Sequence, residues 1–264
     1  MTNWLYNLPI WWIALVVFAA TYVVAAIVYW VVMRLAVDAR ARAFKALSPG
    51  MLPPLATIFA LLVGFIVFQI WADFGKAQLA VANEASALRS AVLLAAVFPP
   101  EEEERVRTLI GSHIEKCVSE DWPAMAKQSA SLTVPPALIE ALQRVLAFAP
   151  ANDGQRTAQR EITTALENAL DARRQRIVIS QSTVNSVKWS GLLLAALVTL
   201  IAIAMVHCDN RLTCAIALTL FATSVALSVF LIAAHNRPFT GQISVGPELL
   251  KQVLPGDLKA GSGH

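Results

Sequence analysis

The sequence predicts an all-α integral membrane protein with four transmembrane helices in two hairpins and a helical extramembrane insert between spans two and three. The 264-residue chain is 57% hydrophobic and only 15% charged, and its mean hydropathy is +0.59. A typical soluble protein is less apolar and more charged. In addition, four apolar segments approach or exceed the roughly 20 residues that cross a bilayer. The bilayer is therefore the expected solvent for much of the chain.

The first predicted hairpin covers residues 1–72. Its first span, about 10–33, exceeds the roughly 7–15 residues of a signal-peptide apolar region and has no basic segment before it. Trp11 and Trp30 near its ends are typical of the membrane interface. After a basic loop, the second span is expected at about 52–71.

The insert, residues 73–188, is predicted to be helical. The apolar positions Val81, Ala85 and Leu88 are spaced by four and three, which is typical of an amphipathic helix continuing out of the second span. A proline pair at 99–100 ends this helix, and the glutamates that follow favour a new helix start.

Two further helices are expected in the insert. Prolines bound a short one within residues 135–150, and the last opens with Asn152 or Asp153 as its N-cap. This last helix is expected to run unbroken into the third span. The second hairpin, 189–234, contains spans at about 189–206 and 212–234, and a turn segment and tail, 235–264, follow.

Composition and motifs exclude several functions. The net charge of +3 is small and dispersed, so nucleic acid is not an expected partner. No nucleotide-binding, hydrolase or metalloprotease motif occurs, and the three cysteines show no CxxC spacing. The sequence therefore predicts no enzymatic activity, no cofactor and no metal.

One pair of residues has metal-ligand spacing. His113 and Cys117 lie four positions apart on one helix face, with Glu120 nearby. No second ligand pair accompanies them, so a surface or interhelical pair is the favoured interpretation over a metal site.

One face of the second span is a candidate pore lining. Leu62, Phe65, Gln69 and Asp73 follow each other at helical spacing and change from apolar to polar towards the insert. In a ring with this helix at its axis, the first two residues would form a hydrophobic constriction and the last two a polar vestibule.

Four segments of the chain form a recognisable pattern, namely 81–100, 118–125, 171–177 and 236–250. Together they resemble a bacterial family of four-helix membrane proteins described as bestrophin-like. Single matching positions lie in the insert, at Glu84 and Trp122, and at the end of the family pattern, at Arg237, Pro238, Phe239, Gly241, Ile243, Val245 and Pro247. The chain departs from the family in residues 47–59, which lack the His, Asn and Asp that members usually carry there.

The resemblance implies a homo-oligomeric ion channel in a bacterial inner (plasma) membrane. Lys and Arg flank the two sides of the predicted spans equally, so the positive-inside rule leaves the topology open. The resemblance favours a cytoplasmic insert with both termini cytoplasmic. The expected partners are the lipid bilayer, further copies of the chain and ions. The alternative is a membrane-anchored interaction or signalling module whose insert binds a protein.

The segment after the fourth span is expected to fold back as a structural latch. Pro238 cannot continue the helix and disfavours helical backbone at Arg237, while Gly241 permits a reversal. Phe239 is then available as an apolar plug. Two carboxylates are candidate partners for the Arg237 guanidinium, namely Asp73 and Glu84.

Overall fold

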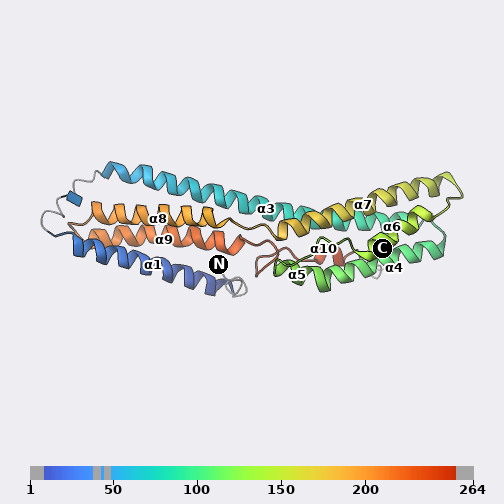
Figure 1. Ribbon diagram of the computed structural model, residues 1–264, viewed down its shortest axis with the longest axis horizontal. Coiled ribbons are helices and arrows are strands. Elements are labelled where there is room, and N and C mark those ends of the chain that lie inside the picture. Colours follow the sequence, from blue (N-terminus) through green and yellow to red (C-terminus); the bar gives the residue numbers. More distant parts are fainter. Residues whose placement is uncertain (1–8, 38–42, 45–48, 254–264) are drawn as a thin grey trace, which may run out of the picture. The chain divides into compact units, whose positions relative to one another are not determined.

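A computed structural model describes residues 9–37, 43–44 and 49–253, and no β-strand occurs in these ranges. Its α-helices are α1 (Ile10–Leu35), α3 (Leu52–Ala95), α4 (Pro100–Lys116), α5 (Trp122–Ala126), α6 (Pro136–Ala147), α7 (Asp153–Ser180), α8 (Ser186–Val206), α9 (Arg211–His235) and α10 (Glu248–Lys251) (Figure 1). A 3₁₀ turn, η2 (Pro49–Met51), precedes α3, and a π-helix, η3 (Cys117–Asp121), joins α4 to α5. The all-α prediction is confirmed.

Among the described residues, four helices are long and apolar enough to cross a membrane. They are Ile10–Leu35, Pro49–Ala95, Ser186–Val206 and Arg211–His235. Each has an 18-residue window with a mean hydropathy of at least 2.3. The prediction of four spans is confirmed.

The chain forms two compact units. The first comprises residues 1–72 and 183–236, of which 1–8, 38–42 and 45–48 lie outside the described residues. In it, α1, α8 and α9 pack against one another. Figure 1 shows these three helices running side by side. The side chains of Phe59, Ile66 and Ile70 on α3 are buried in the same apolar core.

The second unit comprises residues 73–182 and 237–264, of which 254–264, the end of the predicted tail, lie outside the described residues. Its core is formed by apolar faces of α3, α4, α6 and α7, with two residues from the C-terminal segment. Fully buried members are Leu88, Val92, Ile110, Ile114, Leu138, Ile162, Leu166, Leu250 and Val253. The amphipathic spacing of the insert helices therefore reflects a shared core.

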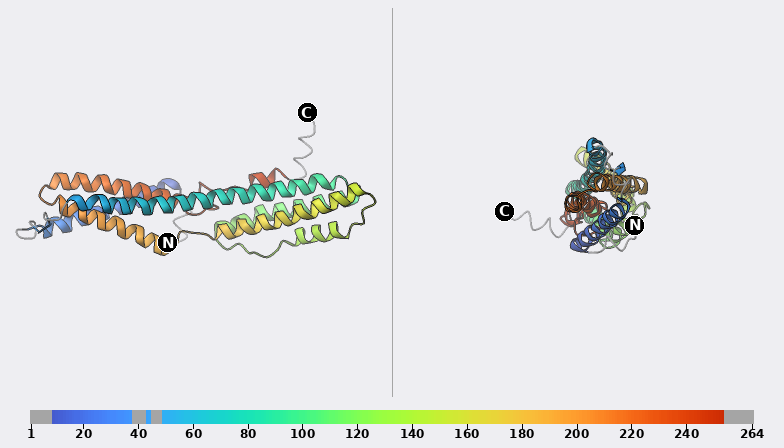
Figure 2. Two further views of the ribbon diagram at one scale, coloured as in Figure 1. Left: turned by 90° about the horizontal axis from the view of Figure 1, so that it is seen from above. Right: turned by 90° about the vertical axis from the view of Figure 1, so that its left-hand side faces the viewer.

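Helix α3 is continuous from Leu52 to Ala95, as the spacing of its apolar residues predicts. The left view of Figure 2 follows it as one unbroken helix. Helix α3 ends at Ala95, and α4 begins at Pro100 with acidic residues in its first turn. Proline fixes φ and lacks an N–H, so it fits the first position of a helix.

The prediction that the last insert helix runs unbroken into the third span is wrong. Helix α7 begins after Asn152, whose side chain accepts a hydrogen bond from Gln155 N, but it ends at Ser180. Helix α8 begins only at Ser186, where the Asn185 side chain accepts a hydrogen bond from Val187 N. A side chain that caps the helix in this way competes with helical backbone bonding and starts a new helix.

Candidate functional site

A buried ion pair forms the centre of the second unit. Arg176 on α7 donates two hydrogen bonds to Glu84 on α3, from Nε to Oε2 at 2.8 Å and from Nη2 to Oε1 at 3.1 Å. Both side chains are 0% exposed. The amphipathic pattern of α3 places Glu84 between buried apolar positions, so its carboxylate points into the core and must find a partner there.

The predicted His113 and Cys117 pair joins this centre. His113 Nε2 lies 3.3 Å from Glu84 Oε1, and Cys117 Sγ lies 3.4 Å from both His113 Nε2 and Arg176 Nη2. Cys117 begins the π-helix η3, a local widening of the helix that often occurs at functional sites. The acidic neighbours are therefore Glu84 from α3 and Asp121, whose Oδ2 lies 3.5 Å from Cys117 Sγ, whereas the predicted Glu120 is exposed to solvent.

A second arginine extends the network towards the surface. Arg173 Nε and Nη2 bind the two carboxylate oxygens of Asp121 at 2.9 and 3.1 Å, and Nη1 donates to the Thr133 carbonyl at 3.0 Å. Asp121 Oδ2 also lies 3.5 Å from Arg176 Nη2. Asp121 therefore connects the two arginines, which lie three residues apart on one face of α7.

Electrostatics keep these groups in fixed protonation states. Burial alone would raise the pKa of Glu84, but Arg176 and the His113 contact outweigh it and lower that pKa below its ordinary value. Burial, reinforced by the Glu84 charge, raises the pKa of the Cys117 thiol. Burial would lower the pKa of Arg176, yet Glu84 raises it. Glu84 and Arg176 are thus charged, and Cys117 is a neutral thiol.

The donor set could in principle hold a metal ion. Glu84, His113 and Cys117 each offer one ligand atom, and these atoms lie within 4.8 Å of one another. However, both oxygens of Glu84 already bind Arg176. The two carboxylates, Glu84 and Asp121, are matched by the two guanidinium groups, so the charges balance without a cation. The arrangement therefore favours a structural ion-pair network over a metal centre.

The C-terminal segment reaches the network through Trp122. The Arg176 guanidinium lies over the Trp122 ring, 4.4 Å from its centroid, and Phe239 contacts the same ring edge-on at 6.1 Å. Trp122 Nε1 also donates to the Val245 carbonyl at 3.1 Å. A cation over one ring and an aromatic at its edge are favourable contacts. Trp122 therefore links the ion pair to the end of the chain.

The residues predicted to form a latch lie in this segment. Phe239 is 5% exposed and packs in an apolar cluster with Val81 and Ile177, among others. Val245 N donates to the Pro238 carbonyl at 2.8 Å, which closes the turn, and Gly241 has a φ of 89° that favours glycine. A stabilising role for the turn stays a prediction.

Arg237 is also buried, at 8% exposure. Of its two proposed partners, Glu84 binds Arg176 and His113, while Asp73 accepts hydrogen bonds from Lys76 Nζ and Ser182 Oγ, each at 3.4 Å. Both carboxylates thus have other partners, and pairing with Arg237 stays a prediction.

The residues predicted to line a pore differ in environment. Phe65 is 71% exposed, whereas Leu62 is half-buried against the core of the first unit. The half-buried Gln69 accepts a hydrogen bond through Oε1 from Lys188 Nζ on α8. No pattern in the sequence indicates this contact, because the two residues are 119 positions apart.

Most of the network was not predicted as a site, although the sequence contained a signal. The four segments that resemble the bestrophin-like family are 81–100, 118–125, 171–177 and 236–250. They supply Glu84, Asp121, Trp122, Met125, Arg173, Arg176, Phe239 and Val245, which converge on this one network.

The four helices of membrane-spanning length and composition define a multi-pass α-helical membrane protein. The family model of the Bestrophin-like domain matches residues 19–250. The chain therefore belongs to the bestrophin-like family, as its sequence predicts. No curated protein and no solved structure matches it.

Proposed function

We propose that the protein assembles into a homo-oligomeric ring and conducts ions along a pathway lined by α3, with Leu62, Phe65, Gln69 and Asp73 facing it. Membership of the bestrophin-like family and four apolar spans support a membrane protein of this kind. The proposed function involves no catalytic reaction and no cofactor. It places the protein in a bacterial inner membrane with the insert and both termini in the cytoplasm.

The single observation that carries the proposal is the poor coverage of α3. Only 11% of its apolar window is buried, against 22%, 39% and 33% in the other three spans. A span at the edge of its own subunit keeps uncovered side chains, which can contact a neighbouring subunit or line an ion pathway. In a ring, the helix facing the axis is of this kind.

The side chains at the end of this span support the same assignment. Phe65 projects a large ring that its own subunit does not cover, so it can form a hydrophobic constriction. Nearer the insert, the Gln69 amide and the Lys188 ammonium form a polar pair. A charged group beside an apolar constriction selects ions by charge.

The first experiment is the subunit count of the full-length protein in nanodiscs, by native mass spectrometry. A closed ring of four or more copies supports the proposal, and a monomer or dimer contradicts it because neither encloses an axial pathway. Ion flux into liposomes then compares wild type with Phe65→Ala, which should widen the constriction and raise flux. Leu220→Ala is the matched control, because Leu220 is 67% exposed on α9.

The alternative, a membrane anchor whose insert binds a protein partner, gives a different result. An anchor can pack every span against lipid or protein and needs no water-lined route. Phe65→Ala would then leave flux at the level of protein-free liposomes. The buried network of the insert fits either function, because it fixes the packing of α3 and α7 in both.

A further inference from the structure

The extramembrane part of α3 presents an uncovered ridge in the second unit. Leu79 is 63% exposed and Leu93 is 59% exposed, and the exposed Ser86 and Arg89 lie between them. These four residues, called the ridge below, follow each other at spacings of seven, three and four, which keep them on one helix face. All four side chains are exposed, so this face of α3 is open to a partner.

Small residues lie beside the ridge, where no close neighbour within the subunit requires a small side chain. A Cβ added to Gly75 would meet nothing within 4 Å. Gly75 and Ala82 line a hollow between α3 and the C-terminal segment, together with Leu249, which is 45% exposed. Small side chains on an open face allow another backbone to approach closely, although they do not identify it.

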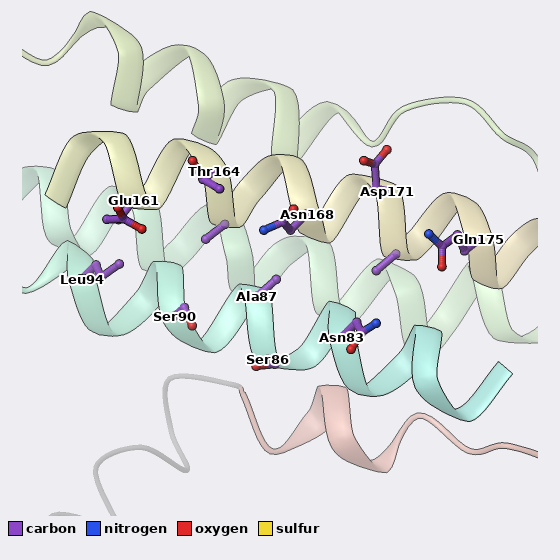
Figure 3. Close-up of a pocket in the computed structure, with 12 residues that line it drawn as sticks. Asn83, Ser86, Ala87, Ser90, Leu94, Glu161, Thr164, Asn168, Asp171 and Gln175 are labelled. Carbon is purple, nitrogen blue, oxygen red and sulfur yellow. The ribbon is translucent and has the colours of Figure 1, made fainter. Parts of the chain in front are cut away.

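Beside the ridge, and sharing Ser86 with it, α3 and α7 form a polar groove of about 610 Å³. Asn83, Ser86 and Ser90 line it from α3, and Glu161, Asn168 and Asp171 are among its residues from α7 (Figure 3). Both acidic side chains are exposed, and neither makes an ion pair with any residue that the structure describes. The groove is therefore negatively charged.

Arg89 supplies the complementary charge. It is exposed, it faces away from the groove on the C-terminal-segment side of α3, and among the described residues it has no ion pair. One subunit thus carries an unpaired cation on one side of α3 and two unpaired carboxylates on the other. Charges arranged in this way complement those of a second copy.

We propose that the ridge of one subunit docks into the α3/α7 groove of the next, with Arg89 of one copy between Glu161 and Asp171 of its neighbour. This inference rests on the proposed ring and names the surface that closes it in the insert. Such a contact joins two different surfaces, so it is head-to-tail and can close into a ring.

The positions of the charges along the ring axis agree with this arrangement. Subunits of a membrane ring share one orientation across the bilayer, so neighbours are related by rotation about that axis. Residues at the same level along the axis therefore face each other. In the groove, Leu94 lies beside Glu161 at one end, and Asn83 lies towards Gln175 at the other (Figure 3). Arg89 lies between Asn83 and Leu94 along α3. Its level along the ring axis is therefore between those of Glu161 and Asp171.

A two-fold pairing of ridge against ridge is disfavoured by the same charges. With both subunits in one orientation, Arg89 of each copy would face Arg89 of the other. Like charges brought together at an interface oppose assembly. The head-to-tail arrangement instead pairs each arginine with carboxylates.

Charge reversal in full-length protein tests the proposal by native mass spectrometry across a dilution series. Arg89→Glu and Asp171→Arg should each weaken assembly by about tenfold or more, because each brings like charges together. The double variant should recover only part of the lost assembly, because the pair with position 171 is restored in the opposite sense while Glu161 still repels the new carboxylate. Glu167→Arg is the control, since Glu167 is exposed on α7 but does not line the groove.

The outcomes separate the two proposals. A monomeric wild-type protein overturns the ring and this interface together. A wild-type ring that both single variants leave intact overturns only the interface. Unchanged helicity and melting temperature of the variants would show that lost assembly is not lost folding.

Cross-linking gives an independent measurement. Two differently tagged chains are co-expressed, one with Arg89→Cys and the other with Asn168→Cys, so that only contacts between subunits form the disulfide. The expected product carries both tags. A disulfide between two Arg89→Cys chains would instead show two-fold pairing and overturn the proposal.

Discussion

Arg176 on α7 and Glu84 on α3 form a two-point ion pair, at 2.8 and 3.1 Å, in which both side chains are fully buried although they are 92 positions apart in the sequence. Desolvation makes such a pair a weak source of net stability, whereas removing one partner leaves an uncompensated buried charge. We infer that the pair determines which faces of α3 and α7 meet.

Arg176→Met should destabilise the insert by about 3–5 kcal/mol, because Glu84 would be left buried without its cation. Thermal unfolding of the purified protein, followed by circular dichroism, measures this loss. Arg174→Met is the matched control, because Arg174 is exposed on the same helix. Equal melting temperatures for both variants would contradict the central role of the pair.

Replacing both partners should cost less than replacing one. The double variant Glu84→Leu with Arg176→Met removes both buried charges and leaves side chains of similar volume, so much of the loss should return. A double-mutant cycle on the same melting data gives the coupling between the two residues. A double variant as unstable as the sum of the single variants would show that the two residues act independently.

Stability of the insert should fall in acid through Glu84. Burial is outweighed by Arg176 and His113, so the folded pKa of Glu84 lies below its ordinary value of 4.5. The folded state therefore binds fewer protons than the unfolded state, and the stabilisation is present above about pH 4.5 and lost as pH falls through the folded pKa. Hydrogen exchange of α3 at pH 7 and at low pH measures this effect. Glu84→Gln should show a smaller acid-induced change, and an equal change would contradict the assignment.

Cys117 should be unreactive in the folded protein. Burial and the Glu84 charge raise the pKa of its thiol, so almost no thiolate forms at neutral pH. Alkylation by iodoacetamide at pH 7.5, followed by peptide mass spectrometry, should modify Cys117 only after denaturation. Rapid modification of the native protein would show that the network opens to solvent.

Phe239→Ala should loosen the C-terminal segment. It removes a buried ring that packs against Trp122, and such a deletion costs about 3–5 kcal/mol. Hydrogen exchange in residues 237–253 should rise. Leu249→Ala is the control, because Leu249 is substantially exposed. Removing the chain from Pro238 onward without any change in assembly or melting temperature would exclude the latch.

Lys188→Glu should change ion selectivity if α3 lines the pathway. It places a negative charge beside Gln69, where the wild-type protein has a positive one, so the preference should move towards cations. Reversal potentials in planar bilayers under a salt gradient measure this shift. Lys116→Glu, an exposed charge change on α4, should leave the reversal potential unaltered.

Much of the site could not be read from the sequence, because its members come from distant segments. The spacing of Val81, Ala85 and Leu88 already places Glu84 on a buried face, which is a signal that a charged partner exists. Nothing in the linear order identifies that partner as Arg176. The pair of His113 and Cys117 was visible from its spacing, but its acidic neighbour was not.

The break between α7 and α8 shows the same limit. Residues 182–185 are weak helix formers, which permits a break, and capping by Asn185 with the hydrogen bond from Val184 N to Asn236 Oδ1 stabilises it. The second contact joins residues 52 positions apart and exists only in the folded chain.

The sequence by itself determined the four spans and the helical insert, because hydropathy and helical spacing are local properties that the bilayer and a shared core select directly. The tertiary structure alone decided that Glu84, Arg176 and Trp122 meet. Buried charges are stable only beside partners of opposite charge, and the packing of distant helices sets which partners those are.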